Sequence, residues 1–330
     1  MENTINTTIL KALEKNEIDL LDFLKNVKET DFNAKPSEVI WSFAENLEHI
    51  ILTEAYVIEN LQRALQEDTE IESRHPNGKV EYLVLSRKRK VIAPNVIEPK
   101  GSLKNKADGV AAFKEVRKES INFFQKINRP LVEIGFPHFT LGMLNGENWG
   151  TFIPAHSERH LKQMKELALL QMLKHSEHKL LSFLEGISEK EFFNKTSETV
   201  WSAAELVEHI VLVETGVRKK LHHLTTLEKQ EVHSNLPSEQ VHELIKDPSR
   251  KVKAPDPFIP KGIFKDKTSA VDALKKSRME LEDFVQNVKV PLHEIGFPHF
   301  VVGMMNGENW LAFMAGHCER HIAQMKTRIA

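Results

Sequence analysis

Two stretches of the sequence each carry a pair of histidines separated by four positions. The pairs are His156 and His160 in the segment HSERH, and His317 and His321 in the segment HCERH. Residues four apart share one face of an α-helix, so each pair can direct two imidazole nitrogens towards one point. Neutral imidazoles are common ligands of divalent metals. The spacing alone leaves two interpretations open, a metal site or an ordinary surface or core pair, because the chain has 16 histidines.

A third histidine accompanies each pair. His49 in WSFAENLEHI and His209 in WSAAELVEHI stand at matching positions among apolar neighbours. A lone histidine in such a place is more often a hydrogen-bonded core residue, but here the same set of three occurs in both halves of the chain. Three imidazoles on facing helices form a metal site that leaves coordination positions for water or substrate, as catalysis requires. We therefore predict one three-histidine metal site in each half.

The chain is a tandem duplication of one domain. The segment 38–54 recurs at 198–214, and EIGFPHFTLGMLNGENW at 133–149 recurs nearly unchanged at 294–310. The near-constant displacement over a whole half indicates a duplicated domain and not a short solenoid unit. The predicted domains are residues 1–168 and 169–330.

Each half is expected to form a four-helix bundle, because apolar residues recur at helical spacing and one long connection permits a crossover. The expected helices of the first half are 4–27, 37–66 (begun by Pro36 and Ser37), 105–128, and one that starts near Gly146 with Asn145 as its cap. Residues 68–104 and the stretch from 129 to 144 are expected to be mainly irregular or turn-rich. The fold class is therefore all-α, with two tandem bundles.

The junction between the halves is expected to be helical. No Gly or Pro occurs between Ala155 and Glu185, so the last helix of the first half should run into the first helix of the second. Pro154 stands inside the expected helix and should kink it or open it locally, because proline lacks an N–H donor.

Three motifs resemble those of the DinB-like superfamily, close to its branch of metal-dependent hydrolases. They are W-S-x-x-E-x-x-x-H, G-x-x-N-G-E-N-W and H-x-E-R-H-x-x-Q-M, and both halves contain all three in the same order. The resemblance implies an up-down-down-up bundle whose metal ligands are His49, His156 and His160 in one domain and His209, His317 and His321 in the other. It also implies zinc or nickel, with manganese or iron as alternatives. Relatives act as hydrolases, thiol S-transferases or thiol-dependent isomerases, so a small-molecule substrate and a low-molecular-weight thiol are implied. The tandem arrangement departs from the single-domain pattern and suggests an internal pseudo-dimer, with further oligomers left open.

Other residues near the histidines have two interpretations each. Glu45 and Glu205 precede the helix-two histidines by one turn and are candidate catalytic carboxylates that orient an imidazole or a water molecule; the alternative is an ordinary surface glutamate. Arg159 and Arg320 could bind an anionic substrate group, although a salt bridge to a neighbouring helix is favoured.

Further aromatic and sulfur-bearing residues are interpreted mainly as structural. His138 and His299 could line a pocket or cap a turn. The tryptophans recur in matching pairs, and core packing is favoured over the alternative of an aromatic pocket; they are Trp41, Trp149, Trp201 and Trp310. Cys318 replaces Ser157 of the first half, so the two sites cannot share a catalytic thiol, and a buried, inert cysteine is expected.

Composition limits the remaining function classes. The formal net charge of −2 is unlike that of a nucleic-acid-binding protein, and the basic run at 87–90 is interpreted as solvated loop charge. The single cysteine, the N-terminus without a signal-peptide pattern and the lack of a long apolar run favour a cytoplasmic protein without membrane spans. No phosphate-binding loop or serine-hydrolase motif occurs. The sequence predicts a metal-dependent hydrolase or small-thiol S-transferase; the alternative is a non-catalytic, metal-stabilised ligand-binding or stress-response module.

Overall fold

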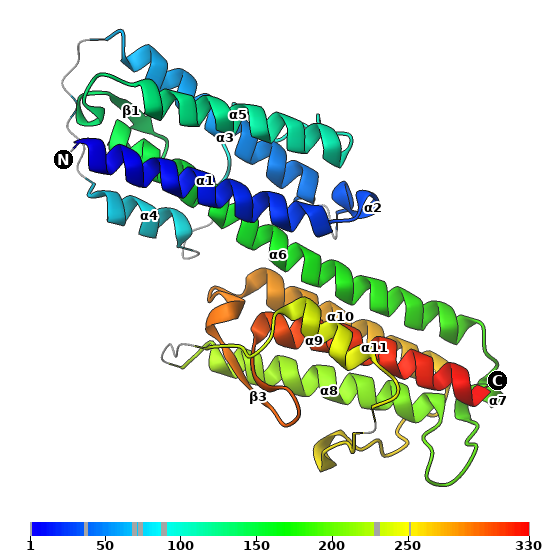
Figure 1. Ribbon diagram of the computed structural model, residues 1–330. Helices are drawn as coiled ribbons and strands as arrows, with labels where there is room; N and C mark the ends of the chain where they lie inside the picture. Colours follow the sequence, from blue (N-terminus) through cyan, green and yellow to red (C-terminus); the bar gives the residue numbers. More distant parts are fainter. Residues whose placement is uncertain are drawn as a thin grey trace. The chain divides into compact units, whose positions relative to one another are not determined.

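The computed structural model describes residues 2–35, 39–67, 71, 75–86, 91–227, 232–250 and 252–329. The chain divides into two compact units, Met1–Ala168 and Leu169–Ala330, and helices dominate both of them (Figure 1). The prediction of an all-α protein with two tandem domains is confirmed. None of the helices in the described ranges combines the length and apolar character needed to cross a bilayer.

Four long helices build the first unit. They are α1 (Glu2–Asn26), α3 (Phe43–Ala64), α5 (Lys106–Lys126) and the first half of α6 (Gly146–Glu185). The bounds of α1, α5 and the start of α6 agree with the prediction to within about two residues. Asn145 caps α6 as predicted, since its Oδ1 accepts a hydrogen bond from the backbone N–H of Asn148 at 2.9 Å.

Helix α3 begins later than predicted. Ser42, not Ser37, is the N-cap, and Ser42 and Glu45 form a capping box in which each side chain accepts the other's backbone N–H. A capping box satisfies two N–H groups that the first helical turn leaves unpaired, so the helix starts at Phe43. The predicted start at Pro36 and Ser37 lies outside the described residues.

The second unit repeats this plan. Its long helices are the second half of α6, α8 (Ala203–Leu224), α10 (Lys267–Asn287) and α11 (Gly307–Ile329). Short helices lie at equivalent places in the two units: α2 (Glu29–Phe32) with α7 (Glu189–Phe193), and α4 (Asn77–Leu85) with α9 (Ser238–Lys246). Single 3-10 turns occur at Leu131–Glu133, Asp256–Phe258 and Leu292–Glu294. Helix α4 was not predicted, but the other described residues of 68–104 lack helix and strand, in agreement with the prediction of a mainly irregular connection.

A β-hairpin precedes the last bundle helix in each unit, where the sequence predicted a turn-rich link. Strand β1 (Gly135–His138) pairs antiparallel with β2 (Gly142–Asn145), and β3 (Gly296–His299) pairs with β4 (Gly303–Asn306). A Cβ on Gly135 would lie 2.2 Å from the carbonyl oxygen of Leu144, so the strands can approach only because that residue is glycine. Gly142 has φ of +76° and closes the hairpin turn.

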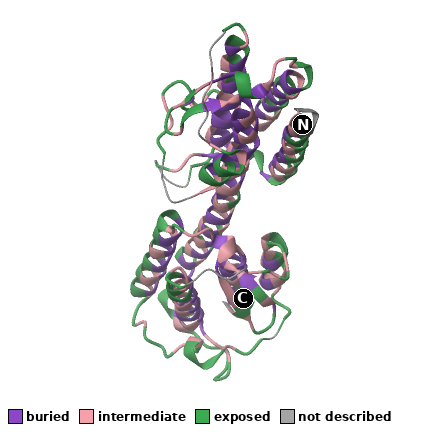
Figure 2. Ribbon diagram, turned by 90° about the vertical axis from the view of Figure 1, so that its left-hand side faces the viewer, coloured by how far each residue is buried: buried purple, intermediate pink, exposed green. Residues whose placement is uncertain are grey.

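The interior of each unit is apolar, and the buried faces of the helices point inwards (Figure 2). The apolar stripe predicted on the first helix is buried throughout; it comprises Ile9, Leu13, Leu20, Leu24 and Val27. Burying a side chain of this size contributes roughly 1.5–3 kcal/mol. This packing fixes the rotation of each helix and therefore which residues face the neighbouring helices.

Helix α6 runs without interruption from Gly146 to Glu185, and the boundary between the units at residue 168 lies inside it. It therefore supplies the fourth helix of the first bundle and the first helix of the second, as the sequence predicted. Pro154 lies within the helix, and the kink expected there stays a prediction.

A buried ion pair lies in the interior of each unit. Arg117 on α5 forms a bidentate ion pair with Glu54 on α3, with N–O distances of 2.8 and 2.9 Å. Both side chains are buried. The second unit pairs Arg278 with Glu214 at 2.6 Å, also buried. Such a pair is costly to break, because removing one partner leaves an unpaired charge inside the bundle.

Candidate metal centre

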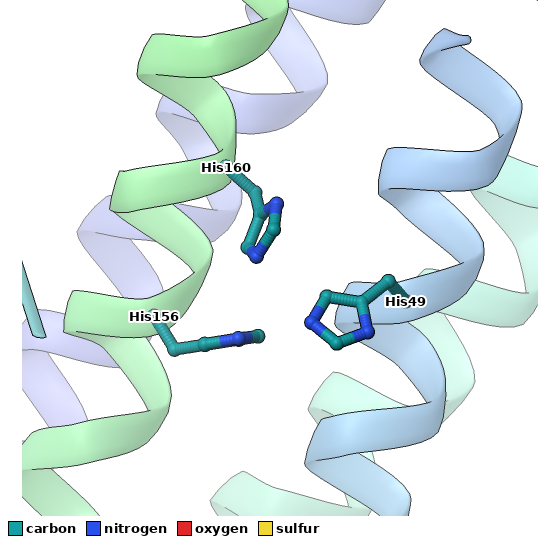
Figure 3. A group of neighbouring side chains, drawn as sticks. All are labelled: His49, His156 and His160. Carbon is teal, nitrogen blue, oxygen red and sulfur yellow. The ribbon is translucent and has the colours of Figure 1, made fainter. Parts of the chain in front are cut away.

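The structure brings together all three predicted histidines of the first unit. His49 projects from α3 towards His156 and His160, which project from successive turns of α6 (Figure 3). One ring nitrogen of each residue lies within 4.8 Å of the others. The ring centroids are 4.6 to 5.0 Å apart. Helix packing alone creates this cluster, since the two helices come from distant parts of the sequence.

The second unit contains the equivalent cluster. His209 comes from α8, and His317 and His321 come from α11. The Nε2 atom of His317 lies 3.2 Å from that of His209 and 3.0 Å from that of His321. Three Nε2 atoms therefore converge on one point.

Hydrogen bonds at the Nδ1 atoms set the tautomers of four of these rings. The acceptors and distances are Ile97 O for His49 (2.7 Å), Asn46 Oδ1 for His160 (3.0 Å), Phe258 O for His209 (2.6 Å) and Gln324 Oε1 for His321 (2.8 Å). A carbonyl oxygen only accepts, so Nδ1 carries the hydrogen and Nε2 keeps a free lone pair. Metal-binding histidines are oriented in the same way, through the ring nitrogen that does not face the metal.

The donor set of the second unit fits a cation. The Nε2 atoms of His209 and His321 both present lone pairs towards His317, and a single N–H on His317 cannot point along both directions. Converging lone pairs repel one another unless a proton or a cation lies between them. Three imidazoles suit a zinc, nickel or iron ion and leave at least one coordination position for another ligand.

Burial keeps the histidines neutral. Desolvation lowers the pKa of His156 and His160 well below the ordinary value of 6.5, and the neighbouring histidines lower it further. Burial likewise lowers the pKa of His321 to about 3. For His49 and His209 burial lowers the pKa, and the hydrogen bond to a backbone carbonyl partly opposes it. All are therefore neutral at pH 7, the protonation state that binds a metal.

A buried glutamate beside each helix-two histidine positions the loop that holds it. Glu48 accepts hydrogen bonds from the backbone N–H groups of Lys100 and Ser102, both at 3.0 Å. This fixes the loop whose Ile97 carbonyl orients His49. Glu208 does the same through Lys261, Gly262 and Ile263. The sequence analysis had set these glutamates aside; the repetition of KVIAPNVIEPKG as KVKAPDPFIPKG was the signal that the loop matters.

The two units use different hydrogen-bond partners to orient the second histidine of the α6 or α11 pair. Asn46 orients His160, but its counterpart in the second unit is Leu206, and Gln324 orients His321 instead. We predict that Asn46→Leu lowers the metal affinity of the first site by about 10- to 100-fold. Gln324→Ala should do the same to the second site.

The chain provides matched controls for this prediction. Leu206→Ala in the second unit and Gln163→Ala in the first alter the equivalent positions. Among the described residues neither side chain forms a hydrogen bond to the histidine ring, so both variants should leave metal affinity unchanged. Competition titration against a chromophoric chelator measures each constant. Equal losses in the test and control variants would contradict the assignment.

Aromatic rings line both sites. Phe152 stacks on His156 with centroids 5.2 Å apart, and Phe313 stacks on His317 at 5.3 Å. Trp41 lies 5.0 Å from His49, and Trp201 lies equally close to His209. The prediction of core packing is thus right for the buried Trp149 and Trp310. Trp41 and Trp201 are half-buried. Trp201 packs against the core of the second unit, as predicted, and also lines the pocket of that unit.

The predicted catalytic carboxylates, Glu45 and Glu205, form hydrogen bonds with the backbone at the start of their own helices. The carboxylate of Glu45 accepts from Ser42 N and pairs with Lys35 at 3.0 Å. Glu205 makes the same contacts with Ser202 and Lys195. These contacts belong to the helix start, and a catalytic role for either glutamate stays a prediction.

Arg159 and Arg320 also contact backbone. Arg159 donates to the carbonyl oxygens of Val84 and Ser86 at the end of α4, and Arg320 donates to that of Arg250. Cys318 is buried, and burial raises the pKa of its thiol to about 12. The prediction of a buried cysteine is confirmed.

His138 and His299 each cap a hairpin turn. The Nδ1 atom of His299 accepts the backbone N–H groups of Val301 and Val302 at 3.1 and 3.2 Å, and His138 makes the equivalent bonds. Nδ1 is therefore the unprotonated nitrogen, and Nε2 carries the hydrogen. Burial lowers the pKa of both rings to about 4.

This pKa shift predicts acid destabilisation. The unfolded chain takes up protons on these histidines below pH 6.5, whereas the folded chain does so only near pH 4. The contribution of these two histidines to the free energy of unfolding is therefore fully present above pH 6.5. It falls as the pH drops from 6.5 to about 4. Urea unfolding of metal-free protein across this range checks it. The double variant His138→Asn/His299→Asn, which keeps an acceptor for the turn, should show a shallower slope; an unchanged slope would contradict the assignment.

A pocket adjoins the histidines of the second unit. Its volume is about 970 Å³, and its walls include His209, His317 and His321 with Trp201 and Phe313. This volume lies at the upper end of the range for small-molecule sites. The candidate metal centre of this unit therefore adjoins a pocket of the size that small molecules occupy.

Comparison with known proteins agrees with this geometry. The family model of the DinB superfamily matches residues 12–164 and again residues 172–325. An uncharacterised protein of Bacillus subtilis, YuaE, is 26% identical over 147 residues, which cover 43% of this chain and 86% of YuaE. No solved structure matches the chain. The chain belongs to the DinB superfamily, a metal-associated family, and contains two tandem copies of its domain.

Proposed function

We propose that each domain contains the active site of a divalent-metal-dependent enzyme. The three histidines hold the metal ion, and zinc and nickel are the favoured ions. The observation that carries this proposal is the convergence of three Nε2 atoms of neutral imidazoles beside an open pocket. When bound, such an ion supplies Lewis acidity, which activates water or a thiol as a nucleophile near neutral pH. The single, buried Cys318 fits a reducing compartment such as the cytoplasm.

The pocket walls favour transfer of a small thiol over hydrolysis. Zinc hydrolases commonly use a glutamate as general base, but no Asp or Glu stands among the described residues that line the pocket. His299 lines it too, and its Nδ1 is occupied by two N–H donors. Its Nε2–H can therefore donate a hydrogen bond to a substrate but cannot accept a proton from water.

The proposed reaction joins a small thiol to an electrophilic acceptor. The sulfur forms a bond to the electrophilic carbon, the leaving group departs with its electron pair, and the thiol proton passes to solvent. Within this chain the three histidines hold the metal ion, and the aromatic pocket walls exclude water. The Nε2–H of His299 donates a hydrogen bond to the electrophilic substrate. The pocket volume of about 970 Å³ is large enough for both reactants.

A reconstitution assay tests this function. Full-length protein is stripped with a chelator, reloaded separately with zinc, nickel, manganese or iron(II), and assayed with cysteine or coenzyme A and a chromogenic aryl halide. We expect turnover to disappear on stripping and to return with zinc or nickel. Ester hydrolysis without a thiol would favour the hydrolase instead. Stoichiometric metal binding without any turnover would favour the non-catalytic binding module and would overturn the enzyme proposal.

A further inference from the structure

The two sites share their histidines but differ in the residues around them. Displacements of 160 or 161 positions match each residue lining the second pocket to one in the first unit. Several matched positions change in size or charge. Tyr56 is replaced by Gly216 and Ile97 by Phe258, and Lys220, Lys253 and Arg328 replace the uncharged Asn60, Ile92 and Leu167. These last three changes each add a positive charge to the second pocket, whereas the replacement of Arg87 by Pro248 removes one.

The second pocket is strongly basic. Its walls contain five cationic side chains, Lys220, Arg250, Lys253, Arg320 and Arg328, and no carboxylate among the described residues. Arg320 is buried and Arg328 half-buried, and each donates to a backbone carbonyl. Within the described ranges no ion pair involves Lys220 or Arg328. Arg250 lies 3.9 Å from the carboxylate of Asp247, and Lys220 and Lys253 are exposed. An excess of cations over carboxylates at the walls of a pocket favours an anionic ligand.

The aromatic packing beside the second pocket also differs from that of the first unit. In the first unit the ring of Tyr56 packs against Phe136 and Phe139, with centroids 5.9 and 5.8 Å apart. The equivalent Gly216 has no side chain, and an added Cβ would lie 2.7 Å from the ring of Phe258. The face of Phe297, the counterpart of Phe136, is covered by the ammonium group of Lys220 at 4.1 Å.

We propose that the second pocket, and not the first, binds an organic anion with a carboxylate or phosphate group attached to an apolar or aromatic body. Lys220, Lys253 and Arg328 attract the anionic group, while Phe297, Phe300 and Phe313 contact the body. The Nε2–H of His299 is an additional donor. The two domains therefore have different ligand specificities. If the proposed transferase function holds, this ligand is one of its two reactants, but the binding itself requires no turnover.

Calorimetric titration of the metal-loaded full-length chain tests the proposal. The probes are 2-naphthoate, 2-naphthyl phosphate and the uncharged 2-naphthalenemethanol. We expect one site per chain for an anionic probe and binding of the neutral probe weaker by at least about 10-fold, the value of one charge-assisted hydrogen bond. Comparison of the two anions distinguishes a carboxylate from a phosphate ligand.

Exchanges between the matched positions provide the variants. Lys220→Asn and Arg328→Leu should each weaken anion binding about 10-fold, with two metal ions per chain retained. The reciprocal variant Tyr56→Gly/Asn60→Lys should raise the stoichiometry from one anion to two. Equal binding of the neutral and anionic probes, or two equal sites in the unmodified chain, would overturn the proposal. If turnover fails but these binding results hold, only the proposed reaction is wrong.

Discussion

The variant His321→Ala should lose the metal of the second site and keep that of the first. Only two imidazoles would remain, so the affinity of that site should fall by more than about 100-fold, since losing a mere hydrogen-bond partner of a ligand already costs 10- to 100-fold. His160→Ala should do the same to the first site. If the second pocket carries the reaction, His321→Ala should abolish turnover and His160→Ala should largely spare it. Metal analysis after dialysis and the thiol-transfer assay measure the two effects.

Two exposed histidines serve as matched controls. His175 lies on α6, the same helix as His160, and His223 lies on α8, the helix of His209; both side chains are exposed. Alanine at either position should leave two ions per chain. If these controls lose as much metal as His160→Ala and His321→Ala, the ions are bound non-specifically and the centre is misassigned.

The variant Glu54→Gln should destabilise the first unit by about 3–5 kcal/mol. The carboxylate neutralises the Arg117 guanidinium, which is 0% exposed and also donates to the carbonyl oxygen of Leu13 at 2.7 Å. Glutamine keeps the shape but leaves the buried positive charge unpaired. Urea unfolding followed by the circular dichroism of the helices measures the change in the free energy of unfolding.

Two further variants separate this effect from a general loss of charge. Glu59→Gln breaks an exposed pair with Arg63 and should change stability by less than about 1 kcal/mol. The double variant Glu54→Gln/Arg117→Met removes both charges and should recover much of the loss. Similar results for Glu54→Gln and Glu59→Gln would show that the buried pair contributes no more than a surface pair.

The metal cluster was predictable because duplication repeated its members at helical spacing. His156 and His160 are visible as a pair four residues apart, and the match of His49 with His209 selects the third member. The start of α3 could also have been predicted from the sequence, since Ser42 and Glu45 have the spacing of a capping box. Glu45 was instead interpreted as a candidate catalytic carboxylate, because a glutamate one turn before a histidine can either cap the helix or orient a ligand.

Other features depend on contacts between distant segments and could not be predicted. Glu48 and Glu54 are spaced on α3 like surface glutamates, and only the packing of the loop and of α5 buries them. The hairpin at Gly135 depends on close approach of two backbones, which a short segment does not reveal. The exchange of Asn46 for Gln324 as partner of the last histidine likewise appears only when the helices are in place.

The central claim is that each domain holds a divalent ion on three imidazoles. X-ray absorption at the metal edge, combined with metal quantification on the full-length chain, tests this claim most directly. We predict two ions per chain, each with about three imidazole nitrogens at about 2.0–2.1 Å if the ion is zinc, and none in the double variant His160→Ala/His321→Ala. A chain that takes up no stoichiometric metal, or an absorption spectrum without imidazole scattering, would contradict the account.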